Sequence, residues 1–172
     1  MRTTPRIAAA LTALFLISAS ANAALLSRAG GQAYYDTDLN VTWLANANLA
    51  AGSIYDDGAS PTDGRMTWAS AQSWIGSLNG ANYLGVNNWQ TPEANAACTG
   101  YACPSSDLYH LFYVEGINDA APSPFSNVGG GYYWSDDAFS SPGSAHVFNL
   151  DNVFGGQQGQ FAKNTSTFAW AW

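Results

Sequence analysis

Basic residues are scarce in this chain of 172 residues, since Lys and Arg number five against twelve Asp and Glu, and the formal net charge is −7. Proteins that bind nucleic acids neutralise phosphates with clustered Lys and Arg, so DNA and RNA are not expected as partners, and sulfated polyanions are disfavoured. The other polar residues are mostly Asn, Ser, Thr, Gln and Gly, and aromatic residues make up 14% of the chain. This composition is suited to neutral glycans and hydrated surfaces.

A hydrophobic run long enough to cross a membrane is also missing. A transmembrane helix needs roughly 20 apolar residues, whereas the run from Ile7 to Ile17 is much shorter. This run follows two arginines and precedes small residues ending at Ala23, which is the pattern of a secretory signal peptide. We expect export to the periplasm, cell surface or medium, with removal of residues 1–23. Residues 24–172 then form a single domain.

Cysteine is limited to Cys98 and Cys103. Exported thiols meet an oxidising environment, so we expect these two cysteines to form a disulfide. A zinc site with His110 as the third ligand is the alternative. Structural zinc is almost always four-coordinate, and no fourth ligand is apparent, so the disulfide is preferred. No metal ion and no cofactor is expected elsewhere in the chain.

The strongest helical pattern runs from Trp68 to Leu78, where large apolar residues recur every three or four positions. Thr67 precedes the pattern as an N-cap, and Asn79-Gly80 provides a stop. After this helix, Tyr83–Val86 is expected to be a short buried extended segment.

Two β-branched and aromatic runs, Gln32–Tyr35 and Val41–Leu44, predict a β-hairpin with the loop Asp36–Asn40 between them. Asp36 and Asp38 could act as calcium ligands, but the Gly and the final Glu of a calcium-binding loop are missing. Hydrogen bonding of Asp side chains to their own backbone is the preferred interpretation.

A second helix is expected over Asp107–Glu115, with Ser106 before it and Gly116 after it. His110 lies next to Leu111 on this helix. It could be a general base or a metal ligand, but no nucleophile or paired carboxylate is placed by the sequence to work with it. A packed structural histidine is therefore preferred.

The last third of the chain predicts an antiparallel meander, because short alternating or aromatic runs are separated by turn residues. The expected strands are Gly131–Ser135, Ala145–Leu150, Gly159–Lys163 and Thr167–Trp172. Strands and two helices in this arrangement indicate an α+β fold.

Four motifs in order resemble the Lcl C-terminal domain family, named for the C-terminal domain of the Legionella collagen-like adhesin. They are Tyr34–Leu44 with Asn48, Met66–Ala71, Asn88–Pro92 and Tyr132–Ser135. The resemblance implies a C-type-lectin-like fold, with two helices packed on small antiparallel sheets and long loops. It also implies an exported adhesive module, since the name-giving member binds sulfated glycosaminoglycans. The family's Trp-Arg-Leu-Pro is Trp89-Gln90-Thr91-Pro92 here, and the missing arginine argues against carrying over polyanion binding.

The leading hypothesis is therefore a non-catalytic surface or matrix module that binds an extracellular glycan or surface protein. An aromatic face with planar polar side chains can stack on a sugar and hydrogen-bond to it. The candidate ligand contacts near the predicted strands are Trp134, Asp136, Asp137, His146, Asn149 and Asp151.

A structural envelope or biofilm component without a small-molecule ligand is the alternative. It would associate through an incomplete final strand edge at Trp172. An enzyme would have to use His110 or His146 with a nearby carboxylate. No catalytic activity is expected, because no nucleophile elbow, metal-binding motif or phosphate loop is present.

Overall fold

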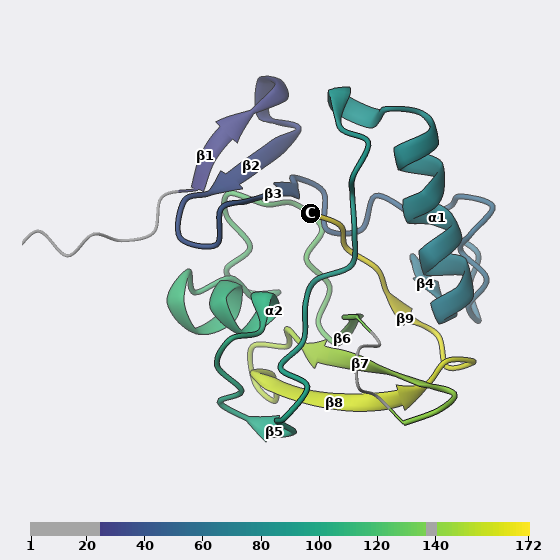
Figure 1. The fold of residues 1–172 in the computed structure, drawn as a ribbon, viewed down its shortest axis with the longest axis vertical. Coiled ribbons are helices and arrows are strands. Elements are labelled where there is room, and N and C mark those ends of the chain that lie inside the picture. Colours follow the sequence, from purple (N-terminus) through teal and green to yellow (C-terminus); the bar gives the residue numbers. More distant parts are fainter. Residues whose placement is uncertain (1–24, 137–140) are drawn as a thin grey trace, which may run out of the picture.

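The computed structural model describes residues 25–136 and 141–172, which form two β-sheets and two helices (Figure 1). The predicted signal peptide at residues 1–23 lies outside the described residues. A three-stranded antiparallel sheet has the order β1-β2-β3, and a six-stranded sheet has the order β4-β9-β6-β7-β8-β5. The strands of the first sheet are β1 (Leu25–Arg28), β2 (Ala33–Asp36) and β3 (Val41–Leu44). Those of the second are β4 (Arg65–Met66), β5 (Gly100–Tyr101), β6 (Tyr132–Trp134), β7 (Ser144–Asn149), β8 (Gln157–Ala162) and β9 (Thr167–Phe168).

The predicted α+β class with antiparallel sheets is confirmed. All strand pairs are antiparallel except β6 with β9, which run parallel through the single pair Tyr133 and Phe168. The predicted meander holds for β6, β7 and β8, but β9 lies between β4 and β6 instead of beside β8. Residues 167–171 are all buried. A segment without a solvated face needs neighbours on both sides, which an edge position would not provide.

Helix α1 (Trp68–Gly80) agrees with the prediction. The side chain of Thr67 accepts a hydrogen bond from the Ser70 amide, which satisfies one of the free N–H groups of the first turn. The buried face consists of Trp68, Ala71, Trp74, Ile75 and Leu78.

The second helix also begins as predicted, because the Ser106 hydroxyl accepts a hydrogen bond from the Tyr109 amide. Only α2 (Asp107–Tyr109) is α-helical, however, and the chain continues as a π-helical turn over His110–Val114. In this turn the amide of Glu115 donates to the carbonyl of His110, five residues earlier.

The prediction of an extended segment at Tyr83–Val86 is wrong. Residues Tyr83–Gly85 form a 3₁₀ turn, in which Leu84 has a left-handed φ of 56°. The indole N–H of Trp89 donates to the carbonyl of Tyr83, and the side chain of Asn79 pairs with both backbone groups of Trp89. The chain therefore folds back around a buried indole, which an extended strand could not do.

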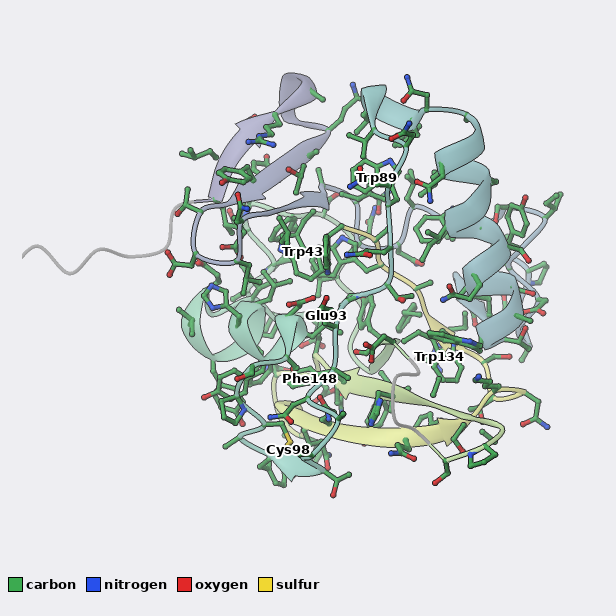
Figure 2. All side chains as sticks on the ribbon, viewed as in Figure 1. Trp43, Trp89, Glu93, Cys98, Trp134 and Phe148 are labelled. Atoms are coloured by element: carbon green, nitrogen blue, oxygen red, sulfur yellow. A yellow bond between two sulfur atoms is a disulfide. The ribbon has the colours of Figure 1, made fainter. Side chains whose placement is uncertain are left out.

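Large aromatic side chains fill the core between the sheets and α1. Trp43, Trp89, Trp134 and Phe148 all point into the body of the molecule (Figure 2). Each ring of this size buries a large apolar surface, which stabilises the fold.

The end of the chain lies in the middle of the molecule (Figure 1). Ala171 accepts a hydrogen bond from the Leu44 amide in β3, and both backbone groups of Trp172 pair with Gln90. The expected exposed edge at Trp172 is therefore wrong, because its N–H and C=O already have partners. This segment joins the two sheets.

Cys98 and Cys103 are joined by a disulfide, as predicted. The alternative zinc site on these two sulfurs is excluded by that bond. None of the helices in the described parts of the chain is both long and apolar enough to span a bilayer.

Candidate functional site

Two of the ligand contacts predicted from the sequence lie in the core. Trp134 has an exposed fraction of 0%, its ring packs edge-on against Trp68, and its indole N–H donates to the carbonyl of Met66. His146 in β7 is also fully buried, and its Nδ1 lies 3.9 Å from Oδ1 of Asp136. A ring covered by protein on its faces leaves no surface on which a sugar could stack.

Two other predicted contacts build a turn. The Asn149 Oδ1 accepts a hydrogen bond from the Asp151 amide, and Asp151 Oδ1 accepts from the amides of Val153 and Phe154. These residues lie at one end of β7, whereas His146 lies toward the other end beside Asp136. Asp137 lies outside the described residues. The structure therefore divides the remaining predicted contacts between separate places.

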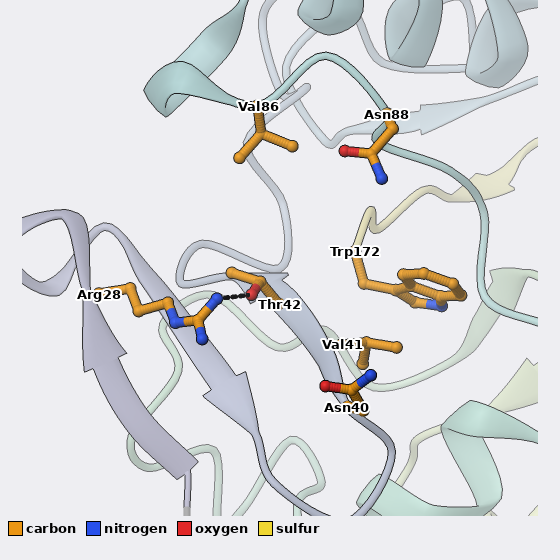
Figure 3. Close-up of a pocket in the computed structure, with 7 residues that line it drawn as sticks. All are labelled: Arg28, Asn40, Val41, Thr42, Val86, Asn88 and Trp172. Carbon is orange, nitrogen blue, oxygen red and sulfur yellow. Dashed lines mark hydrogen bonds between the residues drawn. The ribbon is translucent and has the colours of Figure 1, made fainter.

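A groove of about 240 Å³ lies where the first sheet meets the end of the chain (Figure 3). It collects side chains from four segments: β1, the β2–β3 hairpin, the stretch after α1 and the last residue. The lining residues are Arg28, Asn40, Val41, Thr42, Val86, Asn88 and Trp172.

The polar wall of the groove is held by contacts within the first sheet. The guanidinium carbon of Arg28 lies 3.9 Å from the centre of the Tyr35 ring, and its Nη1 donates to Thr42 Oγ1 at 2.8 Å. The Tyr35 hydroxyl donates to Asn40 Oδ1 at 2.6 Å. Asn40 has a left-handed φ of 58°, which Asn tolerates better than most residues. The cation and the amide are therefore positioned before any ligand arrives.

The aromatic wall is Trp172, which is partly buried. Its backbone pairs with Gln90, and its indole N–H donates to Asp107 Oδ2 at 2.7 Å. Both anchors fix the orientation of the ring. Among the described residues that line the groove, Arg28 is the only ionisable side chain. An indole with amides, a hydroxyl and one cation is suited to binding a polar ring rather than to acid–base chemistry.

The buried carboxylate behind Trp172 has an unusual environment. Asp107 Oδ2 accepts hydrogen bonds from the indole of Trp172 and from the Glu93 amide at 2.6 Å. Burial, with a smaller contribution from the negative charges of Glu93 and Asp136, raises the pKa of Asp107 to about 6, even though the two hydrogen bonds oppose the rise.

The pKa of Asp107 predicts a pH-dependent stability. Because the folded pKa of about 6 exceeds the ordinary Asp value of 3.8, this residue stabilises the fold at low pH and loses that contribution as the pH rises through 6. Relative to an Asp107→Asn variant, the wild type should gain about 2 kcal/mol of unfolding free energy between pH 7.5 and pH 4.5. Urea denaturation at both pH values measures the difference. A difference between the two proteins that does not change with pH would contradict the raised pKa.

The sequence did not indicate the groove, because its residues come from distant segments and share no period. Trp172 and the Asn residues at the turns were visible as polar and aromatic groups, but only the fold brings them together. No protein-family model, curated protein or solved structure matches this chain.

Proposed function

We propose that this chain is an exported, non-catalytic binding module, related to the Lcl C-terminal domain family and C-type-lectin-like in fold, which contacts carbohydrate in the groove beside Trp172. The α+β architecture, the Cys98–Cys103 disulfide and the long connecting segments support this proposal. The observation that carries it is the fixed indole of Trp172 facing the side chains of Asn40 and Asn88 across one groove.

The size of the groove favours a small part of a larger ligand. Ligand pockets usually enclose roughly 300–1,000 Å³, and this groove holds about 240 Å³. We expect one sugar residue to occupy it while the rest of the glycan lies outside.

Charge favours neutral glycans over sulfated ones. The guanidinium of Arg28 already contacts the Tyr35 ring and the Thr42 hydroxyl, and the whole chain carries a formal net charge of −7. In the groove, Arg28 is the only cation that a sulfated polyanion could contact, and the protein as a whole would repel it. Such a ligand would bind only weakly once salt screens the contact with Arg28.

Asn88→Ala should weaken glycan binding about 3- to 10-fold, since one uncharged hydrogen bond contributes roughly 0.5–1.5 kcal/mol. The wild type is first screened on immobilised neutral and sulfated glycans, and the best neutral ligand is then titrated calorimetrically. Asn88 is exposed, so this truncation should leave the fold intact.

Asn164→Ala is the matched control, because Asn164 is also an exposed residue, lies in the turn after β8 and does not line the groove. Its affinity should equal that of the wild type. No binding of the wild type to any glycan, or an equal loss of glycan affinity in Asn88→Ala and Asn164→Ala, would argue against the groove as the binding site.

A structural envelope or biofilm component remains the second candidate, because Val153 and Phe154 are 68% and 70% exposed at the tip of the turn after β7. Two neighbouring apolar side chains on a surface can promote association between copies. Concentration-dependent oligomers in light scattering, together with no glycan binding, would favour this function. A monomer at high concentration would argue against it.

A further inference from the structure

Three polar side chains meet in the interior with atoms that have no hydrogen-bond partner. They are Oδ2 of Asp36, Nε2 of His110 and Oε1 of Glu115. Asp36 is completely buried, and the side chains of His110 and Glu115 are 14% and 10% exposed. Leaving a buried polar atom unpaired is unfavourable, and more so if the atom is charged. Three such atoms in one place therefore need an explanation.

The turn between β2 and β3 aims Asp36 at the other two residues. Its Oδ1 accepts hydrogen bonds from the amides of Asp38 and Leu39, both at 3.0 Å. This confirms the backbone-capping role predicted for Asp36 from the sequence. The cap uses one carboxylate oxygen and leaves Oδ2 directed toward the second helix.

The π-helical turn brings the other two together. In a regular α-helix, residues five apart point roughly 140° away from each other, so His110 and Glu115 would not share a face. Here the bond from the Glu115 amide to the His110 carbonyl wraps an additional residue into the turn. As a result, Glu115 Oε1 lies 3.5 Å from His110 Nε2. Turns of this kind are frequent at functional sites.

The distances fit shared coordination better than hydrogen bonds. His110 Nε2 lies 3.6 Å from Asp36 Oδ2 and 3.5 Å from Glu115 Oε1, beyond the roughly 2.7–3.2 Å of an N–H···O bond. A tetrahedral ion with bonds of ~2.0–2.2 Å holds neighbouring ligand atoms roughly 3.3–3.6 Å apart. All three atoms lie within 4.8 Å of one another.

The charges also favour a cation. Asp36, Glu115 and the adjacent Asp38 are acidic, and within residues 25–136 and 141–172 no Lys or Arg forms an ion pair with Asp36 or Glu115. Two buried carboxylates repel each other unless a positive charge lies between them.

We propose that Asp36, His110 and Glu115 bind one divalent transition-metal ion, with Zn²⁺ preferred and a water molecule as the fourth ligand. One imidazole nitrogen and two carboxylate oxygens match zinc, whereas Ca²⁺ requires six to eight oxygen ligands. The ion joins the β2–β3 turn to the second helix, which lie side by side (Figure 1). This site is separate from the groove, so it does not depend on the proposed function.

Zn²⁺ binding is tested on the full mature chain after treatment with EDTA, by calorimetric titration and by thermal unfolding. The expected result is one Zn²⁺ per chain and a rise in Tm of roughly 5–10 °C at a free Zn²⁺ concentration 100 times Kd. Ca²⁺ at the same concentration should cause no comparable rise. Co²⁺ should give the visible absorption of a four-coordinate nitrogen and oxygen site.

Glu115→Gln and His110→Gln should each weaken Zn²⁺ binding at least about 100-fold, since even partners outside the ligand set contribute 10- to 100-fold. Asp38→Asn is the matched control, because it removes one carboxylate from the same turn without removing a proposed ligand. Its affinity should change less than about 5-fold. Circular dichroism of each variant shows whether it is folded.

Absence of Zn²⁺ binding by the folded wild type would overturn the proposal. Equal affinities in the wild type, folded Glu115→Gln and Asp38→Asn would also overturn it, because the ion would then be held elsewhere.

Discussion

Replacing Trp170 with alanine is expected to lower the free energy of unfolding by about 5 kcal/mol, through loss of a large buried ring and an unpaired carbonyl. The ring of Trp170 is fully buried, with centroids 5.2 Å from Trp43 and 4.9 Å from Phe125. Its indole N–H donates to the carbonyl of Leu44 in β3 at 2.8 Å. Trp170 therefore packs between the two sheets and is hydrogen-bonded to the first of them.

Trp170→Phe is the matched control for this experiment. It keeps an aromatic ring against Trp43 but loses the bond to Leu44, and we expect a loss of about 2 kcal/mol. Guanidinium denaturation with the disulfide intact, monitored by circular dichroism, measures the free energy of unfolding of both variants. Since the free energy of unfolding of small domains is only about 5–15 kcal/mol, the alanine variant should unfold at a much lower denaturant concentration than the wild type. A loss below about 2 kcal/mol in that variant would show that the sheets are not held together at this residue.

Gly64→Ala should destabilise the protein by about 3 kcal/mol, because the new methyl group has no space. A Cβ at this position would lie 1.7 Å from Oδ1 of Asn48 and 2.5 Å from its Cγ. The whole amide of Asn48 would have to move, which would break its bond to the carbonyl of Asp63. Gly64 also has a left-handed φ of 77°, where alanine is strained.

Gly52→Ala separates these two effects. Gly52 has nearly the same φ, 73°, and its amide donates a hydrogen bond to the same oxygen of Asp56 as the amide of Gly64 does. A Cβ at Gly52 meets no atom within 4 Å. This variant should lose only about 1 kcal/mol, from backbone strain alone. If urea denaturation showed that the two variants lose the same free energy of unfolding, the contact with Asn48 would not contribute to the destabilisation of Gly64→Ala.

The groove and the proposed metal site at Asp36, His110 and Glu115 could not be predicted from the sequence, because each joins residues that are far apart along the chain. Asn40, Asn88 and Trp172 share a groove only because the end of the chain pairs with Gln90. Asp36 meets His110 only because the first hairpin lies beside the second helix. The sugar-stacking role predicted for Trp134 depended on an exposure that the core packing removes.

The elements that the sequence determined by itself are those governed by local chemistry. The spacing of apolar residues and the hydroxyl of Thr67 define α1, the polar turn after Asp36 defines the first hairpin, and two nearby cysteines in one loop form a disulfide. Each depends on contacts within a few residues, so periodicity and turn chemistry are sufficient to predict them.

Only the tertiary structure decided the position of β9 and the π-helical turn. A fully buried strand has no alternation to indicate its neighbours, and its place beside β6 depends on which strands occupy the other positions of the sheet. The π-helical turn at His110 follows the same pattern as an α-helix in sequence, and differs from it by a single additional residue per turn. Packing decides between two such similar local geometries, and here that choice places His110 and Glu115 on one face.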